Sequence, residues 1–264
     1  MEKRYIIKGG KQGDERLKKL IKSTWKNTEY HVLKAGLKEN MSVLDVACGS
    51  GIISEKIKTF VGKTGKVTAF DFDPQIIEIA KTNNNSNNII FFVHDISQQN
   101  LDYKNKFDFI FVRFFLSHIP NPNEVLQNLN AMLKTNGILY VEDVDFSGYF
   151  SYPQNNAFDK YVEFYQKISL KRGGNPFIGK ELYEILSKNN FNNTKIYSTN
   201  TCFTEGVGKE IALITFEAIL PALISENYTT QTEGKQIILD LKKITKQENS
   251  IISLPRIFHC FGRK

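Results

Sequence analysis

The sequence predicts an α/β fold in which helices cover both faces of a doubly wound, mostly parallel sheet. Residues 42–46 form a short, apolar and β-branched run, typical of a strand buried on both faces, and a glycine-rich turn follows it directly. Strand-like and helix-like patterns then alternate five times between Asp45 and Asp145. The 264 residues are 41% hydrophobic, which is enough for one large core. We therefore expect a single domain over residues 1–264 with a Rossmann-like sheet.

The chain before the glycine turn divides into an arm and a long helix, together residues 1–36. Residues 1–12 are charged, with an apolar cluster at Tyr5 and a hinge at Gly9-Gly10. We expect Asp14 to cap a helix that Gly36 ends. Its apolar stripe at helical spacing is expected to be buried: Leu17, Leu20, Ile21, Thr24, Trp25, Thr28 and Val32.

Residues 37–145 are expected to form the ligand-binding core. Helices are expected between the strands, one with Asp73 as its cap and Pro74 in its first turn, another over residues 122–134. The expected strands are residues 42–46, 66–70, 89–93, 107–112 and 138–144.

Beyond Asp145 the pattern changes, and a helical cap is expected. Residues 146–152 are aromatic and turn-rich, and helical stripes follow over 158–168, 179–188 and 208–246, with a kink or break at Pro221. Strands are expected over 194–203 and 257–261. The stretch between them is too long for a hairpin loop. We therefore assign residues 146–192 and 206–250 to a cap over the substrate end, and 193–205 and 251–264 to the closing strands.

Charge and cysteine content exclude several kinds of function. Lysine and arginine outnumber acidic residues by 35 to 28, but the lysines are spread along helix faces, so nucleic acid is not the expected partner. Cys48, Cys202 and Cys260 are far apart and lack metal-ligand spacing, so neither a disulfide framework nor a metal site is expected. With no leader, and with the apolar stretch 211–220 broken by Glu217, we expect a cytoplasmic protein without a membrane span.

The glycine turn predicts a nucleotide-type ligand. Gly49 and Gly51 allow the backbone to approach a ligand closely, and the helix that follows offers free N–H groups to an anionic group. A dinucleotide fingerprint needs a third Gly or Ala, where this chain has Ser54. Residues 45–51, Asp-Val-Ala-Cys-Gly-Ser-Gly, instead resemble the D-x-G-x-G-x-G signature of class I S-adenosylmethionine-dependent methyltransferases. Ala47 replaces the first glycine of that signature, and a positive φ is costly for alanine.

This resemblance covers about 100 residues and implies the sheet order 3-2-1-4-5-7-6 and S-adenosylmethionine as the cofactor. Asp71, 20 residues beyond Gly51, is then expected to accept hydrogen bonds from the ribose hydroxyls, with Phe72 against the adenine. Asp95 and Ile96 match the residues that contact the adenine edge. The full set of expected cofactor contacts is Tyr5, Asp45, Ala47, Gly49, Gly51, Asp71, Phe72, Asp95, Ile96 and Arg113.

The acceptor is expected to be small and apolar or aromatic, methylated at oxygen, nitrogen or carbon. Arg113-Phe114-Phe115-Leu116 follows the fourth strand, where amino-group methyltransferases carry N-P-P-Y or D-P-P-Y. The likeness is to bacterial small-molecule methyltransferases, including the ubiquinone and menaquinone type, acting as a monomer or homodimer. Two other readings stay open: an RNA or protein methyltransferase, and a non-catalytic cofactor-binding regulator or partner subunit.

Two groups of side chains are candidates for handling the acceptor. His118 follows the fourth strand and is either a general base or a structural residue that bonds a backbone carbonyl. Glu142, Asp143 and Asp145 cluster at the end of the fifth strand, where one of them could orient an acceptor.

Overall fold

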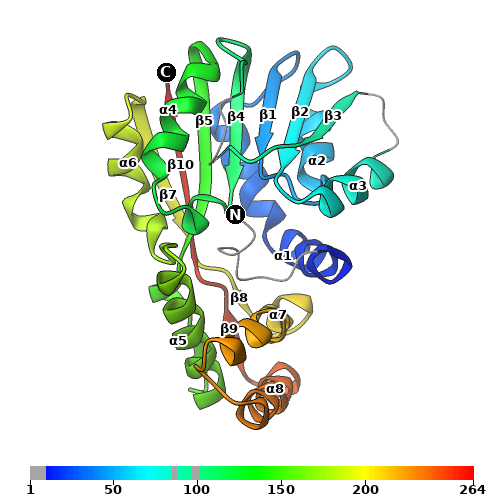
Figure 1. Ribbon diagram of the computed structural model, residues 1–264, viewed down its shortest axis with the longest axis vertical. Helices are drawn as coiled ribbons and strands as arrows, with labels where there is room; N and C mark the ends of the chain where they lie inside the picture. Colours follow the sequence, from blue (N-terminus) through cyan, green and yellow to red (C-terminus); the bar gives the residue numbers. More distant parts are fainter. Residues whose placement is uncertain (1–9, 85–87, 97–100) are drawn as a thin grey trace.

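The computed structural model describes residues 10–84, 88–96 and 101–264. Its main sheet has seven strands in the order β3-β2-β1-β4-β5-β10-β7 (Figure 1). Strands β1 to β5 pair in parallel, whereas β10 runs antiparallel between β5 and β7. Within this sheet β7 is the sixth strand along the chain and β10 the seventh, so the expected order 3-2-1-4-5-7-6 is confirmed. The strands are β1 (Ser42–Val46), β2 (Lys66–Asp71), β3 (Ile89–Val93), β4 (Phe107–Arg113), β5 (Leu133–Asp145), β7 (Asn192–Thr199) and β10 (Arg256–Arg263).

Helices cover both faces of this sheet because successive strand residues point to opposite sides. On one face Val43 and Phe109 pack in a core with α1 and α2. On the other face Leu44 and Ile110 pack in a second core with α4 and α6. The helices of this unit are α1 (Gly10–Ala35), α2 (Ile52–Val61), α3 (Pro74–Asn83), α4 (Pro122–Met132) and α6 (Leu182–Lys188), with the 3-10 turns η1 (Leu116–His118) and η3 (Ile178–Glu181).

A cap with its own hydrophobic core lies beyond the carboxyl ends of the parallel strands, at the bottom of Figure 1. In that core Tyr161 and Phe216 are fully buried, and Phe146 stacks on Tyr165 with ring centroids 4.0 Å apart. The cap elements are α5 (Asn156–Lys171), α7 (Ile211–Ser225), α8 (Gln231–Lys246), the 3-10 turns η2 (Phe146–Gly148) and η4 (Val207–Glu210), and a small sheet β6-β9-β8 of Ser151–Tyr152, Ile251–Ser253 and Cys202–Phe203.

Several element boundaries differ from the sequence prediction. Helix α1 already begins at Gly10, and Asp14 pairs with Lys18 at 2.8 Å inside it instead of capping it. The expected strand 194–203 is divided, because the chain leaves the main sheet after Thr199 and re-pairs as β8 in the small sheet. Helix α7 continues through Pro221 to Ser225.

The packing also changes where the cap is drawn. Leu182 and Leu186 of α6 belong to the core on the sheet face, together with strand residues such as Leu139. Helix α5, in contrast, packs in the cap core. We therefore draw the cap as residues 146–171 and 206–250, and place residues 178–191 with the sheet.

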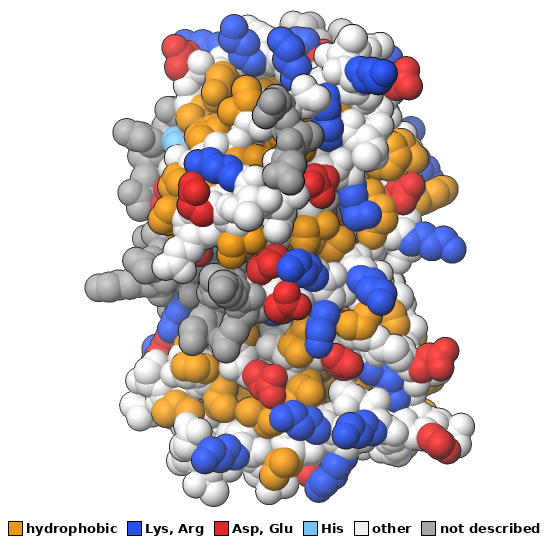
Figure 2. Space-filling view, turned by 90° about the vertical axis from the view of Figure 1, so that its right-hand side faces the viewer, with side chains coloured by type: hydrophobic (Ala, Val, Ile, Leu, Met, Phe, Trp, Pro, Cys, Tyr) orange, Lys and Arg blue, Asp and Glu red, His pale blue; other side chains and the backbone are white. Residues whose placement is uncertain are grey.

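The surface in Figure 2 shows lysine and arginine side chains interspersed with aspartate and glutamate, not gathered into one basic stripe. Within the described residues, no helix has both the length and the run of apolar side chains that crossing a bilayer requires.

Candidate active site

The turn after β1 brings three residues with positive φ into one loop. The φ angles are 55° at Ala47, 55° at Gly49 and 76° at Gly51. A Cβ on Gly51 would lie 2.8 Å from Asn84 Nδ2 and 2.8 Å from Phe91 Cζ, so only glycine fits at this end of α2. Ala47 adopts the left-handed backbone that is costly for alanine, about 1–2 kcal/mol. The turn is therefore kept, with local strain, although its first glycine is missing.

Two carboxylates flank this turn at the ends of β1 and β2. Asp71 accepts backbone N–H groups at both oxygens, from Gly49 at 3.0 Å and from Asp73 at 3.1 Å. Burial raises the pKa of Asp71, and these two N–H groups oppose that rise. Asp45 accepts a hydrogen bond from Ser54 Oγ at 2.6 Å, and burial raises its pKa to about 7. Asp45 is thus held by Ser54, just after the turn, and Asp71 by Gly49 of the turn and by its own neighbour Asp73.

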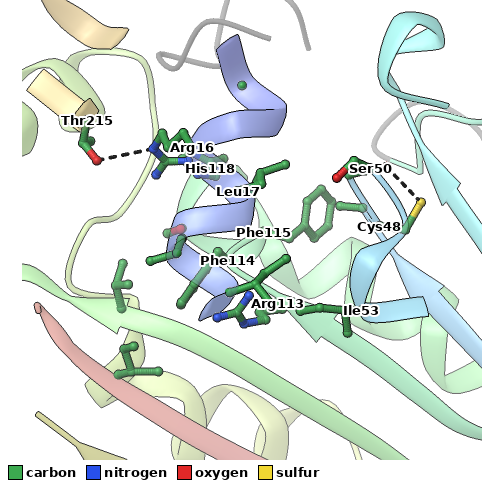
Figure 3. Close-up of a pocket in the computed structure, with 18 of the residues that line it drawn as sticks. Arg16, Leu17, Cys48, Ser50, Ile53, Arg113, Phe114, Phe115, His118 and Thr215 are labelled. Atoms are coloured by element: carbon green, nitrogen blue, oxygen red, sulfur yellow. Dashed lines mark hydrogen bonds between the residues drawn. The ribbon is translucent and has the colours of Figure 1, made fainter. Parts of the chain in front are cut away.

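A single continuous cavity runs from this turn to the cap (Figure 3). At one end its walls come from the turn and from the residues after β2: Asp45, Ala47, Gly49, Ser50, Asp71 and Phe72. In the middle they come from α1 and from the chain after β4: Leu17, Arg113, Phe114, Phe115 and His118, and Arg16 of α1 reaches from there to Thr215 at the far end. At the far end they come from the cap: Phe146, Tyr149, Tyr161, Tyr165 and Thr215.

Among the described residues, three of the expected cofactor contacts do not line this cavity. Ile96 is 3% exposed and packs in the core on the sheet face. Gly51 shapes the turn without facing the cavity, and Asp95 lies beyond β3, outside the cavity wall. Tyr5 falls outside the described residues. The adenine contacts at Asp95 and Ile96 and the contact at Tyr5 stay predictions.

Arg113 lines the cavity, and its guanidinium is held by hydrogen bonds to residues beneath the cavity. Its Nε donates to Glu142 Oε1 at 2.6 Å and its Nη2 donates to Thr24 Oγ1 at 2.5 Å. Glu142 is fully buried, and burial alone would raise its pKa; the charge of Arg113 and the hydrogen bond from His259 instead lower it to about 2. The remaining neighbours of Glu142 are Thr28, at 3.1 Å, and Tyr140, at 3.3 Å. This buried ion pair ties α1 to three strands under the site.

The acidic cluster at the end of β5 does not orient a ligand, which corrects the expectation above. Glu142, Asp143 and Asp145 are all fully buried and absent from the cavity wall. Asp143 accepts the backbone N–H of Ser117 at 3.0 Å, and Asp145 accepts the N–H and Oγ of Ser147. These carboxylates fix the loops at the edge of the sheet, because each is fully buried and accepts hydrogen bonds from neighbouring groups.

His118 follows β4 as expected and faces the cavity. Burial, reinforced by the positive charge of Arg16, lowers its pKa to about 4. The imidazole is therefore neutral at neutral pH, and its conjugate acid is too strong for efficient removal of a proton from a weakly acidic acceptor.

The residues that sequence reasoning missed lie at the far end. Arg16 comes from α1, and its Nε donates to Thr215 Oγ1 of α7 at 3.3 Å (Figure 3). Tyr149 comes from the chain after η2 and Tyr161 from α5. The density of aromatic residues after Asp145 was the available signal for the tyrosines. Nothing local distinguishes Arg16 from the other basic residues of its helix.

Comparison with known proteins adds a family and a fold. A model of the methyltransferase domain matches residues 37–237. A demethylmenaquinone methyltransferase of Staphylococcus aureus (strain MRSA252) is 29% identical over 158 residues, which are 60% of this chain and 63% of that protein. The match thus spans less than two thirds of the curated relative.

Solved structures share the fold at low identity. A protein of Bacillus halodurans C-125 superposes with a TM-score of 0.60 at 21% identity, over 89% of this chain and 97% of its own. The phosphoethanolamine N-methyltransferase 2 of Haemonchus contortus, solved with phosphomonomethylethanolamine and S-adenosylhomocysteine, gives 0.55 at 17% identity, over 90% of this chain and 52% of its own.

Proposed function

The chain belongs to the methyltransferase-domain family, with the class I S-adenosylmethionine-dependent fold, and we propose that it methylates a small aromatic acceptor enclosed by its cap. The observation that carries the proposal is the cavity, which is continuous from the glycine turn to an aromatic end. One ligand can therefore lie against the turn while a second lies against the tyrosines.

The residues at the turn fit S-adenosylmethionine. Each oxygen of Asp71 accepts one hydrogen bond in the structure and retains a lone pair, so the carboxylate can also accept from ribose hydroxyls. Phe72 and Ile76 provide an apolar wall for a purine. Ser50 Oγ is buried without a partner among the described residues, which leaves a hydroxyl for a polar group of the ligand.

The protein contributes alignment and a dry environment to the reaction. S-adenosylmethionine, when bound, supplies a methyl group on a positively charged sulfur. Phe114 and Phe115 line the middle of the cavity, where acceptor and methyl group would meet, and exclude water there. Because the charge disperses as the methyl group moves, an apolar, well-aligned pocket lowers the barrier without a strong base. His118 is then a neutral polar contact.

The same features weigh against the alternatives. An RNA methyltransferase needs a basic groove that leads to the cavity, whereas on the face seen in Figure 2 the basic side chains are mixed with acidic ones. A non-catalytic subunit needs no acceptor pocket, whereas the cap lines an aromatic one here.

A labelled-methyl assay tests the proposal. We expect label from S-adenosylmethionine to enter planar aromatic acceptors, with reduced demethylmenaquinone among the first to try because of the Staphylococcus aureus relative. Bulk RNA serves as the comparison. Label in RNA alone, or S-adenosylhomocysteine binding without turnover on any acceptor, would contradict it.

A further inference from the structure

Arg16 carries a positive charge into the aromatic end of the cavity. Among the described residues, the guanidinium of Arg16 donates to the neutral Thr215 hydroxyl at 3.3 Å, and no carboxylate forms an ion pair with it. By contrast, Arg113 is neutralised by Glu142 at 2.6 Å. A partly buried cation without a counter-charge is unfavourable, so this arrangement leaves a place for an anionic ligand group.

Tyr149 supplies a second polar group on the same wall. The residue is 8% exposed, and its hydroxyl is buried without a well-formed hydrogen bond to any described residue. Burial raises the pKa of Tyr149, opposed by the nearby Tyr161 hydroxyl and by Arg16, so the group stays a neutral donor at neutral pH. A buried hydroxyl of this kind normally has a partner.

These groups face the acceptor and not the cofactor turn. Arg16 is the cation whose charge acts on His118, Tyr149 and Tyr161. The cation that acts on Asp45 is Arg113. In Figure 3 Arg16 extends toward Thr215 of the cap, whereas Ser50 lies on the opposite side of α1.

We propose that Arg16 and Tyr149 form an oxyanion subsite that binds an ionised oxygen, phenolate, enolate or carboxylate, carried by a planar aromatic acceptor. The inference rests on the proposed function and deepens it by naming the acceptor class. Both groups donate hydrogen bonds, and the fixed positive charge of Arg16 favours the ionised form of an acidic hydroxyl. The aromatic rings of the cap contact the planar body of the same ligand.

Calorimetry on the full chain saturated with S-adenosylhomocysteine tests the subsite, with 2-naphthoate and its neutral isostere 2-naphthamide as probes. We expect wild type to bind naphthoate about tenfold tighter than naphthamide, since a charge-assisted hydrogen bond separates the two. Arg16→Gln should abolish this preference and leave naphthamide affinity within about twofold. Tyr149→Phe should weaken naphthoate binding about fivefold.

The control is Lys19→Gln, which removes the same charge from α1 at a residue that pairs with Glu210 outside the cavity. The Lys19→Gln variant should keep the preference for naphthoate over naphthamide. Binding of S-adenosylhomocysteine is measured first, and its absence in wild type would contradict the proposed function itself. If that product binds but wild type does not prefer naphthoate, or binds neither probe, the subsite is wrong. A tenfold loss of S-adenosylhomocysteine affinity in Arg16→Gln would instead assign Arg16 to the cofactor.

Discussion

At the turn after β1, the cavity wall is made of backbone and carboxylates from two adjacent strand ends, Asp45 and Asp71. At the cap, the wall is made of aromatic rings and Arg16, brought from α1, η2, α5 and α7. The first region is held by hydrogen bonds over short stretches of chain, such as Ser54 to Asp45. The second is held by packing between segments up to 199 residues apart, as between Arg16 and Thr215.

This difference suits the cofactor at the turn and the proposed acceptor at the cap in different ways. A turn with fixed N–H groups and carboxylates suits one ligand whose polar groups never change. A cap of separate helices can vary its side chains with little effect on the turn, because the two regions come from different segments of the chain, with the Arg113–Glu142 pair beneath the cavity between them. The fold can thus keep one cofactor and change acceptors.

The largest expected effect concerns the buried Arg113–Glu142 pair beneath the cavity. Glu142→Ala leaves Arg113 buried without its partner, which should lower the free energy of unfolding by about 3–5 kcal/mol in urea denaturation. Lys134→Ala, which removes a partly exposed pair with Asp108, should cost less than about 1 kcal/mol. Equal losses in the two variants would show that the buried pair is not the common support of both regions.

A smaller effect concerns pH and the turn. Asp45 has a folded pKa of about 7, raised by burial above its usual value of 3.8. Its protonated form therefore stabilises the fold fully below about pH 4, and this contribution is lost as pH rises toward 7. Between pH 4 and 8 the free energy of unfolding should therefore fall by roughly 2–4 kcal/mol less in Asp45→Asn than in wild type. Unfolding free energies of both proteins measured without ligand check this, and parallel curves would contradict it.

Cofactor affinity distinguishes the two regions directly. Asp71→Asn removes the negative charge from the proposed ribose site and should weaken S-adenosylhomocysteine binding by about 1–3 kcal/mol in calorimetry. Tyr161→Phe at the cap should leave that affinity within about 0.5 kcal/mol. An indifferent Asp71→Asn would remove the ribose assignment.

The role of His118 is expected to be small. Since its pKa is about 4, lowered first by burial, we expect His118→Asn to change kcat by less than about fivefold with a good acceptor. Between pH 5 and 8, the pH profiles of kcat for wild type and His118→Asn should have the same shape. A thousandfold fall in kcat at unchanged melting temperature would make His118 the general base.

The smallest effect concerns strain in the turn. Ala47→Gly relieves the positive φ of 55° but adds freedom to the unfolded chain, so the two contributions partly cancel. We expect a change in unfolding free energy within about 1 kcal/mol, on the stabilising side. A loss above about 2 kcal/mol would show that the alanine methyl group packs productively, since the turn itself prefers glycine.

The sequence by itself determined the sheet and the glycine turn, and its resemblance to class I methyltransferases implied the strand order. The turn requires particular backbone angles at adjacent residues, and glycines and a β-branched strand encode them locally. Asp71 was predictable for the same reason, because its distance from Gly51 along the chain is set by one helix and one strand.

Only the tertiary structure decided what Arg113, Glu142 and Arg16 do. Arg113 lines the cavity, as a cofactor contact would, but its guanidinium is also paired with Glu142, 29 residues later, which lies beside it in the β4–β5 pair. In the sequence Arg16 cannot be told from any other basic residue of an amphipathic helix. Its place in the cavity depends on its contact with α7, about 200 residues away. Such pairings depend on which surfaces pack together, and the periodicity of one segment does not indicate which other segment it packs against.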